Sequence, residues 1–185
     1  QKKTAIAYNT QGFVDTITDP LLRTTSFLYD GAGRVTQRTL PDGRVIAYAY
    51  DANGNVTSIT PPTRPAHAFA YNAVDMESGY TPPALPGLPT TATQYAYNLD
   101  KQVTTVTRPD GQAISFNYDT GGRLSSLDLP GGAALTYAYS ATTGKLTTVT
   151  TGAASTLAFT YDGSLPLSTA WSGNVAGNVS KTYDN

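Results

Sequence analysis

The sequence predicts an all-β fold built from a repeat, in which a meander of antiparallel hairpins forms a curled, spiralling sheet. Three observations predict it. A tyrosine recurs at a nearly constant spacing, a proline follows most of these tyrosines at a fixed distance, and an aromatic pair closes each unit. A fixed period of about 20 to 50 residues is typical of repeat architectures, and no useful stretch has a helical apolar period.

The tyrosine marks the start of each unit. Successive steps are 21, 21, 21, 26, 21, 21, 22 and 22 residues. We therefore expect one repeat region over residues 1–185, with about eight units of 21 to 26 residues. The last unit stops three residues after it begins, so we expect the chain to be part of a longer protein. The tyrosines that open the units are Tyr8, Tyr29, Tyr50, Tyr71, Tyr97, Tyr118, Tyr139, Tyr161 and Tyr183.

Each unit reads as two strands and two turns. A glycine-centred turn follows the tyrosine, a threonine-rich strand such as 56–60 or 103–107 comes next, then a proline turn, and an aromatic strand such as 44–50 closes the unit. Residues two apart, such as Tyr48 and Tyr50, share one face of a strand. Besides the tyrosines, the expected structural repeat residues are Asp30, Gly33, Asp51, Gly54, Asp119, Gly122, Pro41 and Pro109.

Two features depart from a flat, regular hairpin. Apolar residues fall six and nine positions after the tyrosine, as in Val56 and Ile59, and this odd spacing places them on opposite faces of a regular strand. Either both faces are partly covered or a bulge redirects one side chain. The fourth unit is five residues longer than most, and its proline-rich stretch 84–89 is expected to extend one turn and protrude from one edge of the sheet.

Eight units give about sixteen strands, more than an open twisted sheet of about 10 strands usually holds without curling or splitting. The sheet must therefore coil, stack as a solenoid or divide into blades. A propeller requires odd and even units to differ, and they do not. We expect the aliphatic residues of each threonine-rich strand to lie between the aromatic residues of neighbouring strands.

Composition excludes several classes of function. Apolar residues make up 39% and charged residues 14% of the chain, and the net charge is −1, so a nucleic-acid footprint is absent. No apolar run approaches the length of a membrane span, and no signal peptide is visible. With no cysteine and a single histidine, His67, the sequence predicts no metal or cofactor site and no catalytic triad.

The remaining polar residues are interpreted as structural. The repeat aspartates occupy turn positions, where Asp bonds to its own backbone, rather than a pair of glycosidase carboxylates. Glu77, the single glutamate, is expected at the surface. The tyrosines are alternatively a platform for sugars or peptides, since aromatic faces stack on apolar ligand surfaces. Four scattered arginines are expected to be surface charges of the sheet rather than a site for an acidic partner: Arg34, Arg44, Arg108 and Arg123.

The motif Tyr29-Asp-x-x-Gly-Arg-Val-Thr, repeated from Tyr50 and from Tyr118, resembles the YD repeat of the RHS family. The segment 19–30 is similar to that family's linking sequence, with Leu22 where glycine is usual. The resemblance covers nearly the whole chain and extends to the shells of insecticidal toxin complexes and teneurins. Asn98, Lys101 and Ser140 depart from the motif, so shell geometry is expected to drift there.

The resemblance implies that the chain is part of a hollow β-shell that encloses a C-terminal toxin domain, secreted or delivered to a cell surface by a bacterium. Its implied partners are the rest of the shell and the enclosed toxin, and exposed strand edges are expected to self-associate. The family's cleavage motif at the end of the core is absent, so no protease residues are carried over and the segment is expected not to be an enzyme. The alternative is a carbohydrate- or protein-binding β-repeat module at a cell surface.

Overall fold

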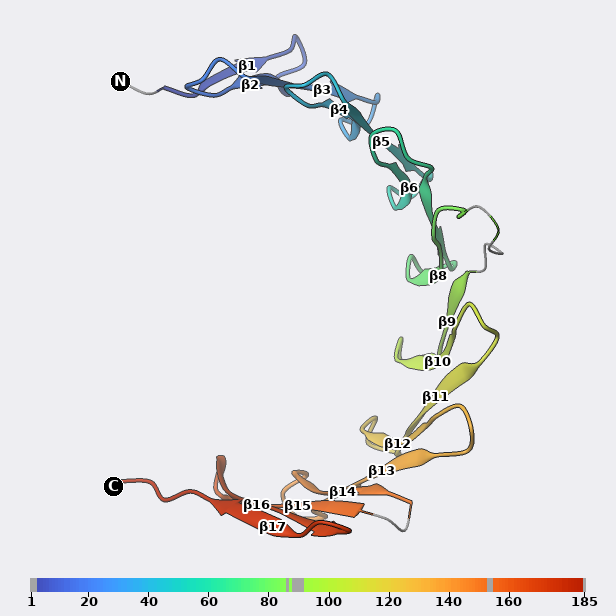
Figure 1. The fold of residues 1–185 in the computed structure, drawn as a ribbon, viewed down its shortest axis with the longest axis vertical. Helices are drawn as coiled ribbons and strands as arrows, with labels where there is room; N and C mark the ends of the chain where they lie inside the picture. The colour runs from blue at the N-terminus through green and yellow to red at the C-terminus, as the bar shows by residue number, and fades with distance from the viewer. Residues whose placement is uncertain (1–2, 86, 88–91, 153–154, 185) are drawn as a thin grey trace. The chain divides into compact units, whose positions relative to one another are not determined.

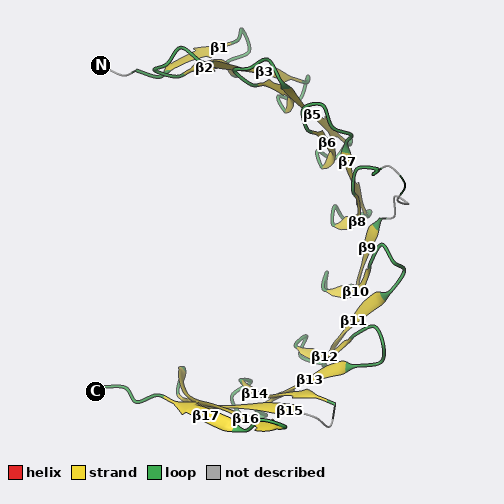
Figure 2. Cartoon of the chain, in the orientation of Figure 1, coloured by secondary structure: helices red, strands yellow, loops and turns green. Residues whose placement is uncertain are grey.

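The structure is a computed structural model that describes residues 3–85, 87, 92–152 and 155–184. Every regular element in these residues is a strand, as Figure 2 shows. The prediction of an all-β fold is therefore confirmed. Within the described ranges, no helix is long and apolar enough to cross a membrane.

Seventeen strands, each of 4 to 9 residues, follow one another along the described chain (Figure 1). The predicted strands 56–60 and 103–107 are β6 and β10, and the predicted strand 44–50 begins one residue later as β5. The strands are β1 Ala5–Tyr8, β2 Val14–Thr18, β3 Thr24–Tyr29, β4 Val35–Thr39, β5 Val45–Tyr50, β6 Val56–Thr60, β7 His67–Tyr71, β8 Glu77–Thr81, β9 Thr93–Tyr97, β10 Val103–Thr107, β11 Ala113–Tyr118, β12 Leu124–Asp128, β13 Ala134–Tyr139, β14 Leu146–Thr151, β15 Ser155–Asp162, β16 Leu165–Gly173 and β17 Gly177–Ser180.

Neighbouring strands pair in the order of the sequence. The pairs are antiparallel, so the predicted meander of hairpins is confirmed. The chain divides into two compact units, residues 1–94 and 95–185, and β9 crosses the boundary. The first unit ends where β8 pairs with the start of β9, and in the second the ladder runs from the rest of β9 to β17.

A β-bulge occurs where seven of the repeat tyrosines meet the following strand. Tyr29 lies opposite Val35, whereas the preceding residue Leu28 lies opposite Gln37, so Thr36 is an extra residue. The bulge therefore brings Val35 and the residue three positions later to the same face, which confirms the second of the two interpretations of the odd apolar spacing. The same register shift occurs at Tyr8, Tyr50, Tyr71, Tyr118, Tyr139 and Tyr161.

The sheet in each unit is a single layer with two different faces. The aromatic face carries the cross-strand pairs Tyr48–Ile59, Phe116–Leu127 and Tyr137–Val149, each contributing about 0.2–1 kcal/mol. The opposite face carries small residues, as where Ala47 pairs with Thr60. Among the described residues no hydrophobic side chain is fully buried, and their strands form no second layer over either face.

The predicted proline-rich extension 84–89 lies largely outside the described residues. Ala84, Leu85 and Gly87 are described and belong to no strand.

Candidate functional site

The aspartate that follows a repeat tyrosine caps the next turn. One carboxylate oxygen of Asp30 accepts hydrogen bonds from the backbone N–H groups of Ala32 at 2.9 Å and Arg34 at 3.0 Å. Its other oxygen accepts from Arg34 Nε at 2.7 Å. Asp119 forms the same set of bonds with Gly121 and Arg123. These carboxylates therefore lie at turn positions and are bonded to their own backbone.

The capping bonds lower the pKa of these carboxyl groups. The pKa of Asp119 lies below its ordinary value chiefly because the Arg123 side chain donates to the ionised form. For Asp30 the largest cause of the lowered pKa is the backbone N–H of Arg34, and for Asp51 it is the side-chain amide of Asn55. A general acid that works near neutral pH needs the opposite shift, so these groups suit turn capping better than acid catalysis.

A residue with positive φ completes each of these turns. Gly33 has a φ of 79°, and its N–H donates to the carbonyl of Asp30 at 3.0 Å. Lys101 replaces this glycine in the fifth repeat, yet it adopts a φ of 62° and donates to the Asn98 carbonyl at 3.1 Å. The turn is therefore retained at Lys101, contrary to the expected drift in geometry there, and the lysine backbone carries the strain.

The tyrosine hydroxyl joins one repeat to the preceding one. The acceptor is the carbonyl of the residue six positions after the previous repeat tyrosine, which is the residue at the bulge. The distances are 2.7 Å from Tyr29 to Val14, 2.8 Å from Tyr50 to Val35, 3.1 Å from Tyr71 to Val56, 2.8 Å from Tyr118 to Val103 and 2.9 Å from Tyr139 to Leu124.

A side chain of the preceding repeat also packs on the tyrosine ring. The Arg34 guanidinium lies 4.6 Å from the centroid of the Tyr50 ring and donates through Nη1 to the Asp51 carbonyl at 3.0 Å. Arg123 lies 4.5 Å from the Tyr139 ring, and Phe13 stacks on Tyr29 at 5.0 Å. We call this combination of a ring contact and a hydroxyl-to-carbonyl bond the tyrosine contact.

The remaining repeat tyrosines are Tyr8, Tyr97, Tyr161 and Tyr183. Tyr8 opens the first repeat, and its side chain is 62% exposed. Tyr161 receives Lys145 over its ring at 5.1 Å, but among the described residues its hydroxyl has no hydrogen-bond partner. Tyr97 ends β9 in the second unit. The hydroxyl of Tyr183 donates to Pro166, 17 residues earlier, at 2.8 Å.

The proline turns have local contacts instead. Asp42, which follows Pro41, accepts from the backbone N–H of Arg44 at 3.1 Å and from its Nε at 2.7 Å. Asp110, which follows Pro109, pairs with Arg108 and accepts from the Gln112 N–H at 3.0 Å. These bonds remain within one turn and do not reach the next repeat.

The single histidine and the single glutamate, His67 and Glu77, begin the neighbouring strands β7 and β8. His67 Nδ1 is 2.7 Å from the Tyr80 hydroxyl, and the two rings are stacked. Glu77 begins β8 and pairs across the ladder with Tyr71. In the described part of the chain, no three His, Cys, Asp or Glu side chains are grouped to hold a metal.

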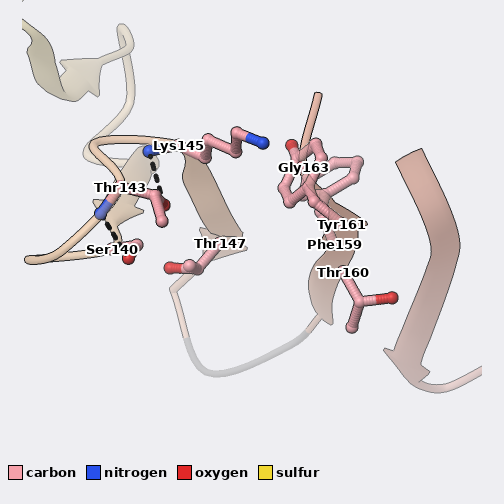
Figure 3. Close-up of a pocket in the computed structure, with 8 residues that line it drawn as sticks. All are labelled: Ser140, Thr143, Lys145, Thr147, Phe159, Thr160, Tyr161 and Gly163. Carbon is pink, nitrogen blue, oxygen red and sulfur yellow. Dashed lines mark hydrogen bonds between the residues drawn. The ribbon is translucent and has the colours of Figure 1, made fainter. Parts of the chain in front are cut away.

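The two larger of the described surface hollows lie in different units. One, of about 540 Å³, belongs to the first unit and is lined mainly by proline and other apolar residues around Arg64 and His67. The other, of about 380 Å³, belongs to the second unit and lies beside Lys145 and Tyr161 (Figure 3). Sequence reasoning identified neither hollow.

The repeat geometry agrees with the comparison to known families. Residues 1–185 match the family described as Teneurin YD-shell. The chain belongs to the teneurin YD-shell family. The predicted YD-repeat membership is thus confirmed, and it supports a structural role in a shell. Among curated proteins, none matches the chain.

Solved structures with a similar fold come from toxin complexes. The structure described as TcdB2-TccC3 without its hypervariable C-terminal region has a TM-score of 0.73 and 15% identity, covering 97% of this chain and 12% of that one. TcdB2-TccC3-Cdc42 has a TM-score of 0.72 with the same identity and coverage. TcdB2-TccC3 has a TM-score of 0.69 at 14% identity, covering 94% and 12%. At these identities the likeness shows the fold alone.

Sequence reasoning placed the tyrosines in the repeat but missed their partners. The acceptor is a backbone carbonyl, which has no side-chain signature. The ring partner did have a signal, because Arg34 and Arg123 stand five positions after their own tyrosine and one position before the apolar residue. That spacing becomes interpretable only when the bulge is known.

Proposed function

We propose that the chain is a non-catalytic wall segment of a bacterial YD shell that encloses a toxin or effector domain until delivery. The chain spans 12% of the length of the solved toxin-complex chains that it resembles, so the remaining wall would come from other parts of the same protein. We further propose that residues 1–185 form one continuous repeat region and that the whole protein is secreted or delivered to a cell surface.

The observation that carries this proposal is the uncovered single-layer sheet. A soluble domain normally buries a hydrophobic core, and the described residues contain no fully buried hydrophobic side chain. A wall separates two compartments and therefore keeps both faces available. The solved structure described as lacking a hypervariable C-terminal region supports a variable enclosed domain as the partner.

We further propose that the edge of β1 can pair with a strand of the same shell or of a second copy of the chain. Tyr8 is 62% exposed, whereas Tyr29 and Tyr50 are half-buried against the preceding repeat. A strand paired there would offer a ring partner and a carbonyl to Tyr8. Without it, the open strand edge is a surface for self-association.

Single-cysteine labelling tests whether one face of the sheet lines an enclosed interior. The chain contains no cysteine, and Ser58 and Ile59 are adjacent residues of β6 on opposite faces. In the full-length protein, we expect a bulky maleimide to label only one of Ser58→Cys and Ile59→Cys, whereas a small maleimide labels both. After the shell is unfolded in urea, the bulky reagent should label both. Equal labelling by the bulky reagent in the native protein would contradict an enclosing wall.

A further inference from the structure

The proline turn between β6 and β7 departs from the other proline turns at its charged residues. In the turns that contain Pro41 and Pro109, an aspartate follows the proline and pairs with a nearby arginine. In the turn between β6 and β7, Thr63 stands in the position of that aspartate, and Arg64 follows it. Among the described residues the Arg64 side chain forms no ion pair. This turn therefore presents a positive charge that no described carboxylate balances.

Arg64 lies at the hollow of about 540 Å³ in the first unit, where two proline-containing segments meet. One segment is the turn itself, with Pro61 and Pro65, and the other follows β8, with Pro83 and Leu85. They meet because β6, β7 and β8 are consecutive antiparallel strands, so β6 and β8 end on the same side of the sheet. The volume is within the ordinary range for small-molecule sites. The proline rings offer an apolar surface that loses almost no side-chain entropy when a ligand covers it.

His67 adds an aromatic ring and a second polar group to this hollow. It begins β7, and its Nδ1 lies 2.7 Å from the Tyr80 hydroxyl, with the two rings stacked. Tyr80 is not among the residues that line the hollow, so Nε2 is the nitrogen of His67 that remains for a ligand. When the Tyr80 hydroxyl donates to Nδ1, the neutral imidazole carries its proton on Nε2 and can donate to an acceptor.

We propose that this hollow binds a small aromatic carboxylate, a molecule with a flat ring and a carboxylate on a short arm. The Arg64 guanidinium would pair with the carboxylate, whose planar geometry it matches, and His67 Nε2 would donate to the same group. The ring would lie against the proline rings, where a rigid ligand has few bonds to immobilise compared with an alkyl chain. The site does not depend on the enclosure of a toxin.

Isothermal titration calorimetry of the full chain with hydrocinnamate tests the site. We expect a saturable isotherm with one ligand bound per chain. Hydrocinnamyl alcohol, which has the same ring and arm but a neutral hydroxyl, should bind about tenfold more weakly. Hexanoate, which has the carboxylate but no ring, should bind severalfold more weakly. Equal affinity for the alcohol would overturn the ion pair with Arg64, and equal affinity for hexanoate would overturn the aromatic assignment.

Substitutions in the turn locate the bound carboxylate. Arg64→Gln should lower the hydrocinnamate affinity about tenfold, because the amide is polar but uncharged. Thr63→Asp should also lower it, because it places a carboxylate beside Arg64 as in the other proline turns. Aspartate tolerates the φ of 56° at this position. His67→Phe keeps a ring but removes the nitrogen, so the affinity should fall severalfold.

Arg44→Gln is the matched control. Arg44 lies in the proline turn of the preceding repeat and is already paired with Asp42 at 2.7 Å, so the hydrocinnamate affinity should not change. A urea midpoint close to that of the unsubstituted chain would show that Arg64→Gln retains the fold. Absence of a saturable isotherm, or unchanged affinity in either Arg64→Gln or Thr63→Asp, would overturn the site. An equal loss of affinity in Arg44→Gln would overturn it in favour of general attraction between anions and surface arginines.

Discussion

The Tyr–Asp turns and the proline turns lie at opposite ends of the strands and differ in how far their contacts reach. At the Tyr–Asp turns, Arg34 contacts the ring of Tyr50 and the carbonyl of Asp51 in the next repeat. At the proline turns, the bonds that Asp42 forms with described residues stay within its own turn and involve Arg44. Both turn types carry Asp and Gly, so composition alone does not determine which end of the hairpins connects the repeats.

The difference indicates that contacts between repeats are concentrated at the strand ends that carry the Tyr–Asp turns. Gln102 Nε2 bonds to the Gly122 carbonyl at 2.6 Å, which is another contact between Tyr–Asp turns of adjacent repeats. Stability of a repeat array is the sum of repeat stabilities and nearest-neighbour terms. We therefore expect substitutions at the Tyr–Asp turns to change the interaction free energy between neighbouring repeats. Substitutions at the proline turns should change only the stability of their own repeat.

Gly33→Ala should have the largest effect. A Cβ at Gly33 would lie 2.5 Å from Phe13 Cζ, so the Phe13 ring would have to leave Tyr29, and the φ of 79° is unfavourable for alanine. We expect a loss of about 3 kcal/mol in the free energy of unfolding, measured by urea denaturation.

Gly43→Ala is the matched change at a proline turn. Gly43 has a φ of 82°, but a Cβ there meets nothing within 4 Å, so only the backbone cost of about 1 kcal/mol is expected. Equal losses for the two variants would contradict the difference between the turn types.

Tyr50→Phe removes a single inter-repeat hydrogen bond. Its hydroxyl donates to the Val35 carbonyl at 2.8 Å, and we expect a loss of about 1 kcal/mol in the free energy of unfolding. Tyr48→Phe, on the same strand, is the control, because among the described residues the Tyr48 hydroxyl has no partner. Hydrogen exchange should show faster opening of β4–β5 in Tyr50→Phe than in Tyr48→Phe.

Acidification should lower the free energy of unfolding through both turn types. The effect per site should be smaller than those above, because these carboxylates are exposed. The pKa values of Asp119 and Asp110 are lowered in the fold, chiefly by the side chains of Arg123 and Arg108 respectively. Their contribution is therefore complete above the unfolded pKa of about 3.9 and is lost as pH falls through the lower folded pKa.

Asp119→Asn and Asp110→Asn should each reduce the fall in urea midpoint between about pH 6 and pH 2. In NMR spectra, acidification should shift the Tyr139 ring signals, because Asp119 holds Arg123 against that ring. Asp110→Asn should leave this shift unchanged. A Tyr139 shift that requires Asp110 would contradict the local character of the proline turns.

The smallest change in the free energy of unfolding is expected at two positions, one in each turn type, where a residue other than glycine has a positive φ. Leu22 in a proline turn and Lys101 in a Tyr–Asp turn adopt φ values of 63° and 62° at positions where other repeats have glycine. Leu22→Gly and Lys101→Gly should each raise the free energy of unfolding by about 0.5–1 kcal/mol, because the strain is in the backbone of the turn itself. A markedly larger gain at Lys101 would show that turn strain spreads between repeats.

The spacing of Tyr, Pro and Gly predicted the hairpins because those residues determine local backbone geometry. The strand 56–60 was predicted without error, and the odd spacing of Val56 and Ile59 pointed to the bulge. The carbonyl partners of the tyrosines could not be predicted, since every residue has the same backbone group. The hollow beside Lys145 also could not be predicted, because it depends on how Ser140 and one additional residue reshape a turn.

The tyrosine hydrogen bond has a direction along the chain. In each case the donor belongs to the later repeat and the acceptor to the earlier one, as with Tyr50 and Val35. A polypeptide leaves the ribosome with its N-terminus first, so the acceptor is synthesised before the donor arrives. Every new repeat can therefore attach to one that is already complete, and we expect such a sheet to extend from its N-terminal end during translation.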